Sequence, residues 1–384
     1  MKQKPLHIVF LSAEYPLWAS GGVGTFIQTL GRALVAKGHN VSVVGPGMKA
    51  EEERLIDQGV QLYRLKKNPL PGPNFVYNAF AINSKLKKLH QQIPIDIIES
   101  AELGLALLSS AHKAKKVIRL HGGHHFFAEA ERRGINWRKG LLEKRSFKKA
   151  DAFIAGTDYV RSHTAKYLSY HNAKVVILPY PLQTDIALPH VEIDKNMILF
   201  AGTVCEKKGV RQLLQAFKLV REQKPDSRLE LYGRDWFYPD GRSYIEEIKK
   251  ELSADHFVDV HFKGAIPRGE LDLQYAKAAV CVFPSHMETQ GLVSLEAMLL
   301  EKAVVFSKYG PGPETIEHGQ TGLLCDVYEP EDIAKQILWV LNNPSEAAEM
   351  GARARKAVMS RYELEQVTGA NVEFYQSLQN KIHG

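Results

Sequence analysis

The strongest constraint on the fold of this chain is a repeated alternation of short apolar segments with segments of helical periodicity. Runs rich in valine and isoleucine are typical of strands buried on both faces of a parallel sheet, and apolar residues recurring every three to four positions are typical of helices. In the first part of the chain, strands are expected at 7–12, 41–45, 60–65, 96–100, 116–121, 151–156 and 174–179, and helices at 23–37, 50–58, 79–91, 104–112 and 158–169. This alternation predicts an α/β fold with a doubly wound parallel sheet.

A second series of the same kind begins at MILFAG (197–202), after a segment with three prolines and little periodicity (179–194). A chain of 384 residues is long enough for two or three domains with full cores. We therefore expect two Rossmann-like domains that face a cleft, at 1–182 and 196–362, joined by a linker at 183–195.

The charge is divided unevenly between these domains. Residues 1–190 contain 27 Lys and Arg against 14 Asp and Glu, whereas the whole chain has a net charge of only +7. In the segment 132–149, basic residues alternate with apolar ones such as Trp137 and Leu141. This pattern fits an anionic membrane surface or an anionic acceptor, and it equally fits a helix with a solvated basic face.

Several classes of protein are disfavoured by the composition. The first apolar run, LHIVFL (6–11), is too short for a signal peptide, and no run approaches the roughly 20 residues that span a bilayer. We expect a cytoplasmic protein, with peripheral association at the inner face of the membrane as a further option. The three cysteines lie far apart without metal-ligand spacing, and no nucleic-acid-binding module is visible.

The most informative stretch for function is PSHMETQGLVSLEAMLLE (284–301), which follows the apolar run AAVCVF (278–283). The pattern predicts a strand, a loop carrying Glu288, and a helix that begins near Gly291 and carries Glu296. A helix start binds phosphate through its free N–H groups, and a carboxylate on the second turn is placed to accept hydrogen bonds from a ribose. The alternative is that both glutamates are solvated surface residues.

Another phosphate-binding arrangement is expected in FAGTVCEKKGV (200–210). Here two lysines follow a strand and precede Gly209, which opens a helix, so Lys208 can reach a diphosphate and offset the charge of a leaving group. The glycine-rich loop SGGVGTF (20–26) also follows a strand. A dinucleotide-binding turn fits it poorly, because the spacing is not G-x-G-x-x-G and no acidic residue follows the second strand.

Histidines gather in RLHGGHHFF (119–127), where His121 stands at the carboxyl end of an expected strand. Ligands bind at such strand ends in open α/β sheets. A zinc site built from His121, His124 and His125 is conceivable, but no nearby carboxylate or cysteine completes a usual ligand set. A structural role for these histidines remains the alternative.

Glu288 and Glu296, eight positions apart, resemble the paired-glutamate motif of the retaining glycosyltransferase family 4, whose members have the GT-B fold. The resemblance covers essentially the whole chain. It implies transfer of a sugar from a UDP- or GDP-sugar to a saccharide or lipid-linked acceptor, in the synthesis of cell-surface polysaccharides or glycoconjugates, without a cofactor or metal. It also implies that the helix at 363–380 returns to the first domain.

The resemblance assigns roles to particular residues. Glu288 contacts the donor sugar or its phosphates, the amides near Gly291 and Leu292 bind the diphosphate, and Glu296 holds the ribose. His121 contacts the transferred sugar, with His124 as a second choice. The base lies near the backbone of Gly264 to Ile266, and the loop glycines approach acceptor and phosphate groups; these are Gly21, Gly22 and Gly24.

The chain departs from the family pattern at three positions. Thr203 stands where an arginine is expected, so that Lys207 or Arg234 has to supply the second positive charge beside Lys208. Gln290 replaces an aromatic residue before Gly291, and Glu301 replaces a glycine after the helix. Two alternatives therefore stay open, a catalytically weakened sugar-nucleotide binding protein and an isomerase of the same fold that acts on the nucleotide sugar itself.

Overall fold

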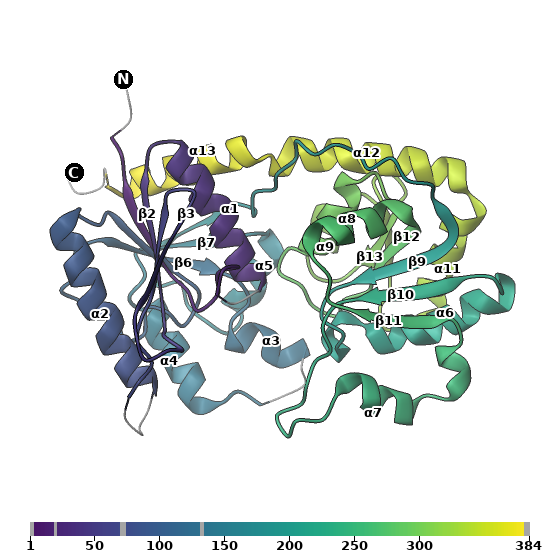
Figure 1. The fold of residues 1–384 in the computed structure, drawn as a ribbon, viewed down its shortest axis with the longest axis horizontal. Helices are drawn as coiled ribbons and strands as arrows, with labels where there is room; N and C mark the ends of the chain where they lie inside the picture. Colours follow the sequence, from purple (N-terminus) through teal and green to yellow (C-terminus); the bar gives the residue numbers. More distant parts are fainter. Residues whose placement is uncertain (1–3, 19–20, 70–73, 131–133, 380–384) are drawn as a thin grey trace. The chain divides into compact units, whose positions relative to one another are not determined.

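The computed structural model describes residues 4–18, 21–69, 74–130 and 134–379. The chain divides into two compact units, each described here by itself. Unit 1 comprises Met1–Glu129, Arg133–Gln183 and Tyr362–Gly384, and unit 2 comprises Ala130–Arg132 and Thr184–Arg361. Each unit is an α/β body built on a mostly or wholly parallel sheet, as the alternation predicts (Figure 1).

Unit 1 contains, in its described residues, a sheet of eight strands in the order β3-β4-β2-β1-β5-β6-β7-β8. The strands are β1 (His7–Leu11), β2 (Asn40–Gly45), β3 (Glu53–Asp57), β4 (Val60–Arg64), β5 (Ile97–Ser100), β6 (Lys115–Leu120), β7 (Ala152–Ala155) and β8 (Lys174–Ile177). Described neighbours pair in parallel apart from β3, which pairs antiparallel with β4. The central strands β1, β5 and β7 are buried along their whole length, which explains their continuous apolar sequences.

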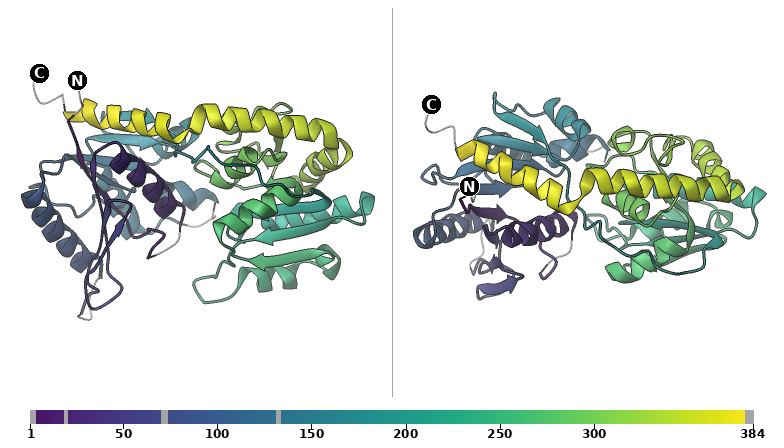
Figure 2. Two further views of the ribbon diagram at one scale, coloured as in Figure 1. Left: turned by 45° about the horizontal axis from the view of Figure 1, so that its top comes forward. Right: turned by 90° about the horizontal axis from the view of Figure 1, so that it is seen from above.

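Helices pack against the sheet of unit 1. They are α1 (Gly22–Ala36), α2 (Asn74–Gln92), α3 (His124–Ala130), α4 (Trp137–Phe147), α5 (Asp158–Ala165) and α13 (Leu364–Gln379). Although α13 comes last in the chain, it packs beside α1 (Figures 1 and 2). Its buried face includes Val367, Val372 and Leu378. The last helix therefore belongs to the core of the first unit.

Unit 2 contains a sheet whose six described strands are all parallel, in the order β11-β10-β9-β12-β13-β14. The strands are β9 (Asp194–Ala201), β10 (Arg228–Tyr232), β11 (Val260–Gly264), β12 (Ala278–Phe283), β13 (Val304–Ser307) and β14 (Leu323–Cys325). The helices are η1 (Glu206–Lys208), α6 (Val210–Gln223), α7 (Tyr244–Glu251), η2 (Ala254–Phe257), α8 (Arg268–Lys277), α9 (Leu292–Leu299), α10 (Gly312–Thr315), α11 (Pro330–Asn342) and α12 (Pro344–Tyr362). One hydrophobic core joins β9, β12, α6 and α11.

Two of the expected helices are wrong. The segment 50–58 forms β3, because Gln58 and Gly59 adopt positive φ angles of 47° and 88° and make a tight hairpin with β4. The segment 104–112 forms consecutive turns. The Nζ of Lys149 donates to the carbonyl oxygens of Ala106 and Leu108 at 3.1 and 2.5 Å, so a distant side chain satisfies backbone groups that a helix would pair internally.

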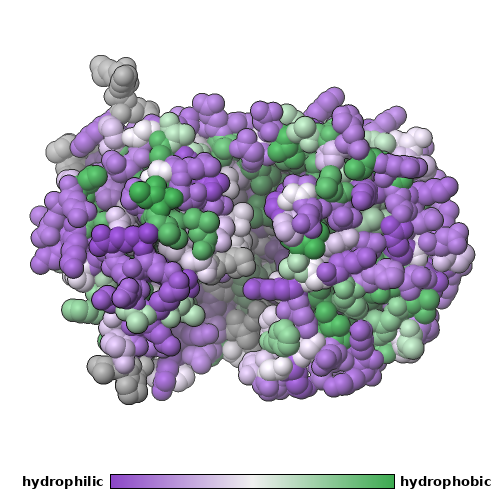
Figure 3. Space-filling view, viewed as in Figure 1, coloured by the Kyte–Doolittle hydropathy of each residue, from purple (hydrophilic) through white to green (hydrophobic). Residues whose placement is uncertain are grey.

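The surface is mostly polar. Hydrophilic residues cover most of the visible face of each unit, with smaller apolar patches between them (Figure 3). Among the described residues, no helix is both long enough and apolar enough to cross a membrane. All three cysteines are buried free thiols.

Candidate functional site

The candidate site of unit 2 lies at the carboxyl edge of its sheet, where β9 ends at Ala201 and β12 ends at Phe283. These strands are neighbours, and the strand order reverses between them, which is where ligands bind in open α/β sheets. The loops that follow them contact each other, because the N–H of His286 donates to the carbonyl oxygen of Lys207 at 2.9 Å. The two loops singled out in the sequence therefore form one surface.

Gly209 determines how Lys208 is presented on this surface. Its φ of 69° is in the left-handed region, where it ends η1 and begins α6. A Cβ atom at this position would overlap the carbonyl oxygen of Pro284. Glycine is thus required both by the turn and by the close approach of the second loop.

Lys208 and Glu288 form an ion pair. Ser285 Oγ donates to the same carboxylate oxygen of Glu288 at 3.3 Å. The two charged side chains are 18% and 13% exposed, so the pair is mostly covered but can be reached from solvent. A phosphate that binds Lys208 has to compete with Glu288 for the ammonium group.

The loop continues into α9 through Gly291, whose φ is 73°. A Cβ at Gly291 would press on the ring of Phe306, so this position also requires glycine. The N–H groups of Leu292 and Val293 precede the first acceptors within the helix and remain available to an anion. The N–H of Ser294 already donates to the carbonyl oxygen of Gly291 at 3.0 Å. Gln290, in contrast, is 1% exposed, so its side chain supports the loop from inside.

Glu296 lies on the second turn of α9 and forms an ion pair with Arg268 at the start of α8. The Nε of Arg268 also donates to Asp272 at 2.8 Å. Burial raises the pKa of Glu296, and the positive charge of Arg268 opposes that shift. The sequence analysis missed Arg268, because nothing in its local sequence indicates the partner that the fold supplies 28 positions later.

The loop expected near the base of a nucleotide precedes Arg268 directly. Gly264 ends β11 with a φ of 72°, and its carbonyl oxygen accepts the N–H of Gly233 at 2.9 Å. Gly264 is exposed and Ile266 half-buried. Since α8 packs on α9, this loop and Glu296 belong to the same surface.

Arg234 lies beside the position of the missing arginine. The N–H of Val204 donates to the carbonyl oxygen of Arg234 at 2.9 Å, so the segment after β10 runs next to Thr203. Thr203 is half-buried, and the side chain of Arg234 is exposed. The fold thus brings the backbone of one suggested substitute next to Thr203.

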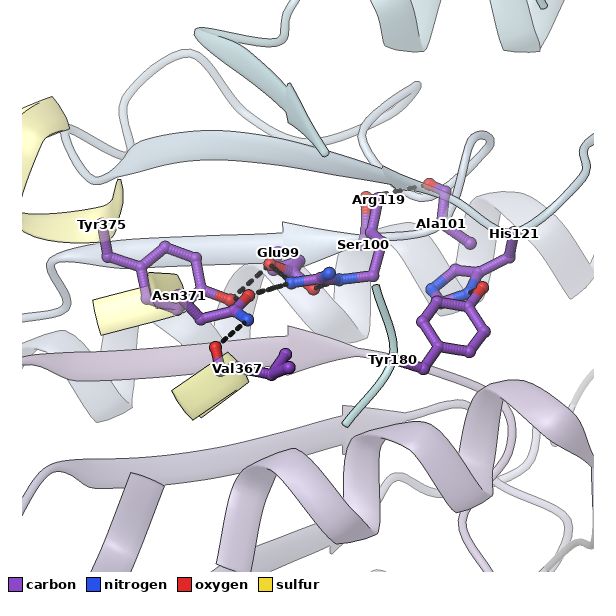
Figure 4. A network of polar contacts seen from close by, with 9 residues as sticks. All are labelled: Glu99, Ser100, Ala101, Arg119, His121, Tyr180, Val367, Asn371 and Tyr375. Atoms are coloured by element: carbon purple, nitrogen blue, oxygen red, sulfur yellow. Dashed lines mark hydrogen bonds and ion pairs between the residues drawn. The ribbon is translucent and has the colours of Figure 1, made fainter. Parts of the chain in front are cut away.

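In unit 1, His121 follows the last residue of β6. Its Nδ1 lies 2.5 Å from the hydroxyl of Tyr180 (Figure 4). Its ring centroid lies 5.4 Å from that of Phe26 on α1. Burial, reinforced by the nearby charge of Arg119, lowers the pKa of His121 to about 3. The imidazole is therefore neutral at physiological pH.

Two buried carboxylates that the sequence analysis missed hold the loop after His121. Glu102 accepts the N–H of Gly122 at 2.8 Å, and Glu143 accepts the N–H of His124 at 2.7 Å. Glu143 also pairs with the ring of His125 and has no exposed surface. Burial raises the pKa of Glu102 to about 8, and the neighbouring negative charge of Glu143 acts in the same direction.

The ring of His124 has a structural partner. Its Nε2 accepts the N–H of Asn136 at 2.8 Å, which ties the loop to the start of α4. No group of three or more His, Cys, Asp or Glu side chains in the described ranges is arranged to hold a metal ion.

The glycine-rich loop of unit 1 surrounds a carboxylate of the chain itself. The N–H of Gly24 donates to Glu14 at 3.3 Å, and a Cβ at Gly21 would overlap the same carboxylate. Gly22 opens α1 and has free space around its Cα. The loop glycines were expected to approach phosphate groups, but the start of α1 already faces the carboxylate of Glu14. Ser20 of this loop lies outside the described residues.

Two family models match the chain. Residues 20–185 match Glycosyltransferase Family 4, and residues 187–357 match Glycosyl transferases group 1. The chain is 24% identical to a GDP-mannose-dependent alpha-(1-6)-phosphatidylinositol monomannoside mannosyltransferase of Mycolicibacterium smegmatis, with 89% of this chain and 91% of that protein covered.

Solved structures share the fold. Sucrose-phosphate synthase from Thermosynechococcus elongatus superposes with a TM-score of 0.83 at 20% identity, covering 98% of this chain and all of that one. An Anabaena protein solved in complex with UDP-glucose gives a TM-score of 0.75 at 15% identity, covering 97% and 100% of the two chains. The two Rossmann-like sheets are therefore those of the GT-B fold.

Proposed function

The chain belongs to the family 4 glycosyltransferases, and we propose that it moves a hexose from a nucleoside-diphosphate sugar to a saccharide or glycolipid acceptor. One observation carries the proposal: the Lys208–Glu288 and Arg268–Glu296 pairs flank the start of α9, at the edge of the unit 2 sheet where the strand order reverses between β9 and β12. The amides that we propose for phosphate, the ammonium group of Lys208 and the carboxylate that we propose for the ribose thus belong to one surface.

We propose a UDP- or GDP-sugar as the donor. GDP-mannose appears in the name of one relative, and UDP-glucose is bound to one structural neighbour. The acceptor proposal, a saccharide or lipid-linked saccharide in surface polysaccharide or glycoconjugate synthesis, draws support from the phosphatidylinositol-linked acceptor of the same relative. We further propose a cytoplasmic enzyme that meets an anionic membrane surface through residues 132–149, of which 132 and 133 lie outside the described residues.

In the proposed reaction, the bond from the anomeric carbon to the diphosphate breaks while the acceptor oxygen bonds to the same face of that carbon. Configuration is thereby retained, and the acceptor proton passes to an oxygen of the departing diphosphate. Lys208 and the first amides of α9 stabilise the negative charge that develops on this leaving group. Glu296 holds the ribose, and Glu288 exchanges its bond to Lys208 for contacts with the donor sugar.

His121 acts in this scheme as a neutral hydrogen-bonding group for the sugar. With a pKa of about 3 it carries no proton to donate as a general acid near pH 7. The leaving diphosphate therefore depends for charge stabilisation on unit 2. Thr203 at the arginine position favours a second candidate, a weakly active nucleotide-sugar binding protein, unless Arg234 or Lys207 supplies the missing charge.

A thermal-shift panel with UDP, GDP, ADP and their sugar conjugates tests the donor site, using wild type, Glu296→Ala and the exposed control Glu222→Ala. A ligand at about 100 times its Kd stabilises the protein by about 2.7 kcal/mol. We expect one nucleotide to raise the Tm of wild type and Glu222→Ala by several degrees, and to leave Glu296→Ala unchanged. A panel in which no nucleotide shifts wild type would contradict the proposed donor site.

Turnover separates the candidates that bind a nucleotide. Release of free nucleoside diphosphate that requires an added acceptor, with an NMR spectrum showing the donor's anomeric configuration in the product, supports transfer. Binding without turnover supports the weakened protein, and an altered sugar still attached to its nucleotide supports an isomerase.

A further inference from the structure

Unit 1 carries a groove that the proposed sugar transfer does not use. It has a volume of about 600 Å³ and lies between the second half of α4 and the residues that follow α5. Both segments lead into the amino ends of β7 and β8, whereas His121 lies at the carboxyl end of β6. The groove, here called the α4–α5 groove, is therefore at the opposite edge of the sheet from the loop that follows His121, here called the histidine loop.

The floor of the α4–α5 groove is apolar. Phe147 and Leu168 line it and are 1% and 4% exposed, so they form a firm base. Leu141 lines one side and is 60% exposed. Trp137, one helical turn before Leu141 and 68% exposed, extends the apolar stripe along the same face of α4.

The rim of the groove is cationic. Lys144 and Arg145 line it from α4, Lys148 from the residue directly after α4, and His171 from the segment after α5. Lys144, Arg145 and Lys148 are exposed, and none is paired with a carboxylate among the residues that the structure describes. The nearest acid in the sequence, Glu143, has no exposed surface and faces the histidine loop instead.

An apolar floor beside a cationic rim suits a molecule that is apolar at one end and anionic at the other. We propose that the α4–α5 groove binds an acyl chain of an anionic membrane lipid, whose phosphate contacts Lys144, Arg145 and Lys148. Leu141 and Trp137 then enter the outer part of the bilayer. This inference rests on the proposed membrane partner, and it is independent of donor binding and of sugar transfer.

Vesicle flotation tests the charge requirement, with phosphatidylcholine vesicles alone or containing phosphatidylglycerol. Each basic residue near an anionic surface strengthens binding by about fivefold. We therefore expect Lys144→Glu with Lys148→Glu to weaken binding to the anionic vesicles by at least about 30-fold. The matched control, Lys87→Glu with Lys88→Glu on the exposed face of α2, makes the same change in net charge and is expected to change binding by less than about threefold. Equal losses in the two double variants would overturn the proposal in favour of general electrostatic attraction.

Three further measurements test the acyl chain itself. Ser169→Trp, at an exposed position on the groove, is expected to block the chain and weaken vesicle binding while leaving all cations in place. Lipids with brominated chains are expected to quench the fluorescence of Trp137. The contribution of Trp137 is the part of the fluorescence that is lost in the variant Trp137→Phe. Decyl phosphate is expected to compete with vesicles at concentrations at which butyl phosphate and inorganic phosphate do not.

The results also show which proposal fails. Unchanged binding by Ser169→Trp, or equal competition by inorganic phosphate, means that the site recognises phosphate alone, and the lipid proposal is then wrong. Circular dichroism and the nucleotide-induced Tm shift of each variant report whether the fold and the donor site are intact. Loss of vesicle binding with an unchanged nucleotide shift supports the groove, whereas a nucleotide shift missing from wild type contradicts only the proposed donor site.

Discussion

Glu301 holds a backbone conformation that favours glycine. It lies two residues after the end of α9 and has a φ of 59°, and the N–H of Lys302 closes the turn by donating to the carbonyl oxygen of Ala297 at 3.1 Å. A left-handed conformation costs an L-residue about 1–2 kcal/mol, a cost that glycine avoids. Glycine loses part of this advantage because it has more conformational freedom in the unfolded chain. The departure from the family pattern at this position therefore affects the end of the helix.

We expect Glu301→Gly to raise the free energy of unfolding of unit 2 by about 0.5–1 kcal/mol. Urea denaturation followed by tryptophan fluorescence measures the change. Glu301→Ala is the control, because alanine keeps the strain while losing the same carboxylate. A gain of equal size in both variants would show that the charge, and not the backbone, is responsible.

Glu102 makes the stability of unit 1 depend on pH. Its pKa of about 8 lies above its ordinary value near 4.5, so the folded state binds a proton that the unfolded state releases. The resulting stabilisation is complete below about pH 4.5 and is lost as pH rises through 8. The carboxyl group is buried beside Glu143, and it also holds the N–H of Gly122.

Glu102→Gln keeps an acceptor for Gly122 but cannot ionise. Between pH 6 and 8, we expect wild type to lose about 2 kcal/mol more of its unfolding free energy than the variant does. Parallel urea titrations at several pH values measure this difference. Identical pH profiles would indicate that Glu102 is ionised in the folded protein already at pH 6.

The sequence indicated some of the candidate site because part of the pattern is local. Lys208, Gly209 and Glu288 stand in loops directly after apolar strands, so their places at the carboxyl edge follow from the strand pattern alone. Arg268 and Glu143 escaped notice, because a cation or carboxylate becomes informative only when the fold supplies its partner. The roles proposed for these residues in binding and transfer stay predictions.

At the scale of elements, α13 completes a buried polar network in the core of unit 1 (Figure 4). The Nε of Arg119 donates to Glu99 at 2.7 Å, and the Nη2 donates to Asn371 on α13 at 2.6 Å. The hydroxyl of Tyr375 donates to Glu99 at 2.6 Å. These four side chains are at most 2% exposed, so each bond compensates a charge or dipole that water cannot reach.

Asn371→Leu removes a short hydrogen bond from a buried guanidinium. The Nη1 of Arg119 already lacks a hydrogen-bond partner in the described residues, so the variant leaves this charge poorly solvated. We expect the free energy of unfolding of unit 1 to fall by about 2 kcal/mol and the Tm to fall by about 4–8 °C, as measured by scanning calorimetry. Glu373→Ala, at an exposed position on the same helix, is expected to change the Tm by less than about 1 °C. Equal Tm values for wild type and Asn371→Leu would mean that the hydrogen bond contributes nothing.

The elements that the sequence misassigned are those whose conformation depends on distant residues. The segment EEERLID (51–57) is short and has few apolar residues, so the spacing of its apolar residues does not distinguish a helix from a strand. It pairs as β3 because the turn at Gln58 and Gly59 brings it against β4, and because Asp57 accepts hydrogen bonds from Tyr15 and Arg32. Helices with a continuous apolar stripe, such as α6 and α11, were predictable from period alone.

At the scale of the whole molecule, the last segment of the chain belongs to the first unit. Residues 362–384 are grouped with unit 1, whereas α12 up to Arg361 is grouped with unit 2. The chain therefore leaves unit 1, forms unit 2, and returns. Unfolding of such a two-unit protein need not be two-state, so each unit requires its own probe.

Deleting residues 363–384 should destabilise unit 1 while leaving unit 2 folded. The deletion removes the buried face of α13 and leaves Glu99 and Arg119 without two of their partners, Asn371 and Tyr375. Removing a partner from a buried charged network costs about 3–5 kcal/mol before the lost apolar contacts are counted. Hydrogen exchange is expected to accelerate across β1, β5 and β6, with unit 2 strands such as β9 and β12 staying protected. Deletion of residues 380–384 alone is the control and should leave both patterns unchanged. Protection of β5 and β6 that survives the longer deletion would mean that the sheet of unit 1 is stable without α13, and that the returning helix serves some purpose other than completing the core.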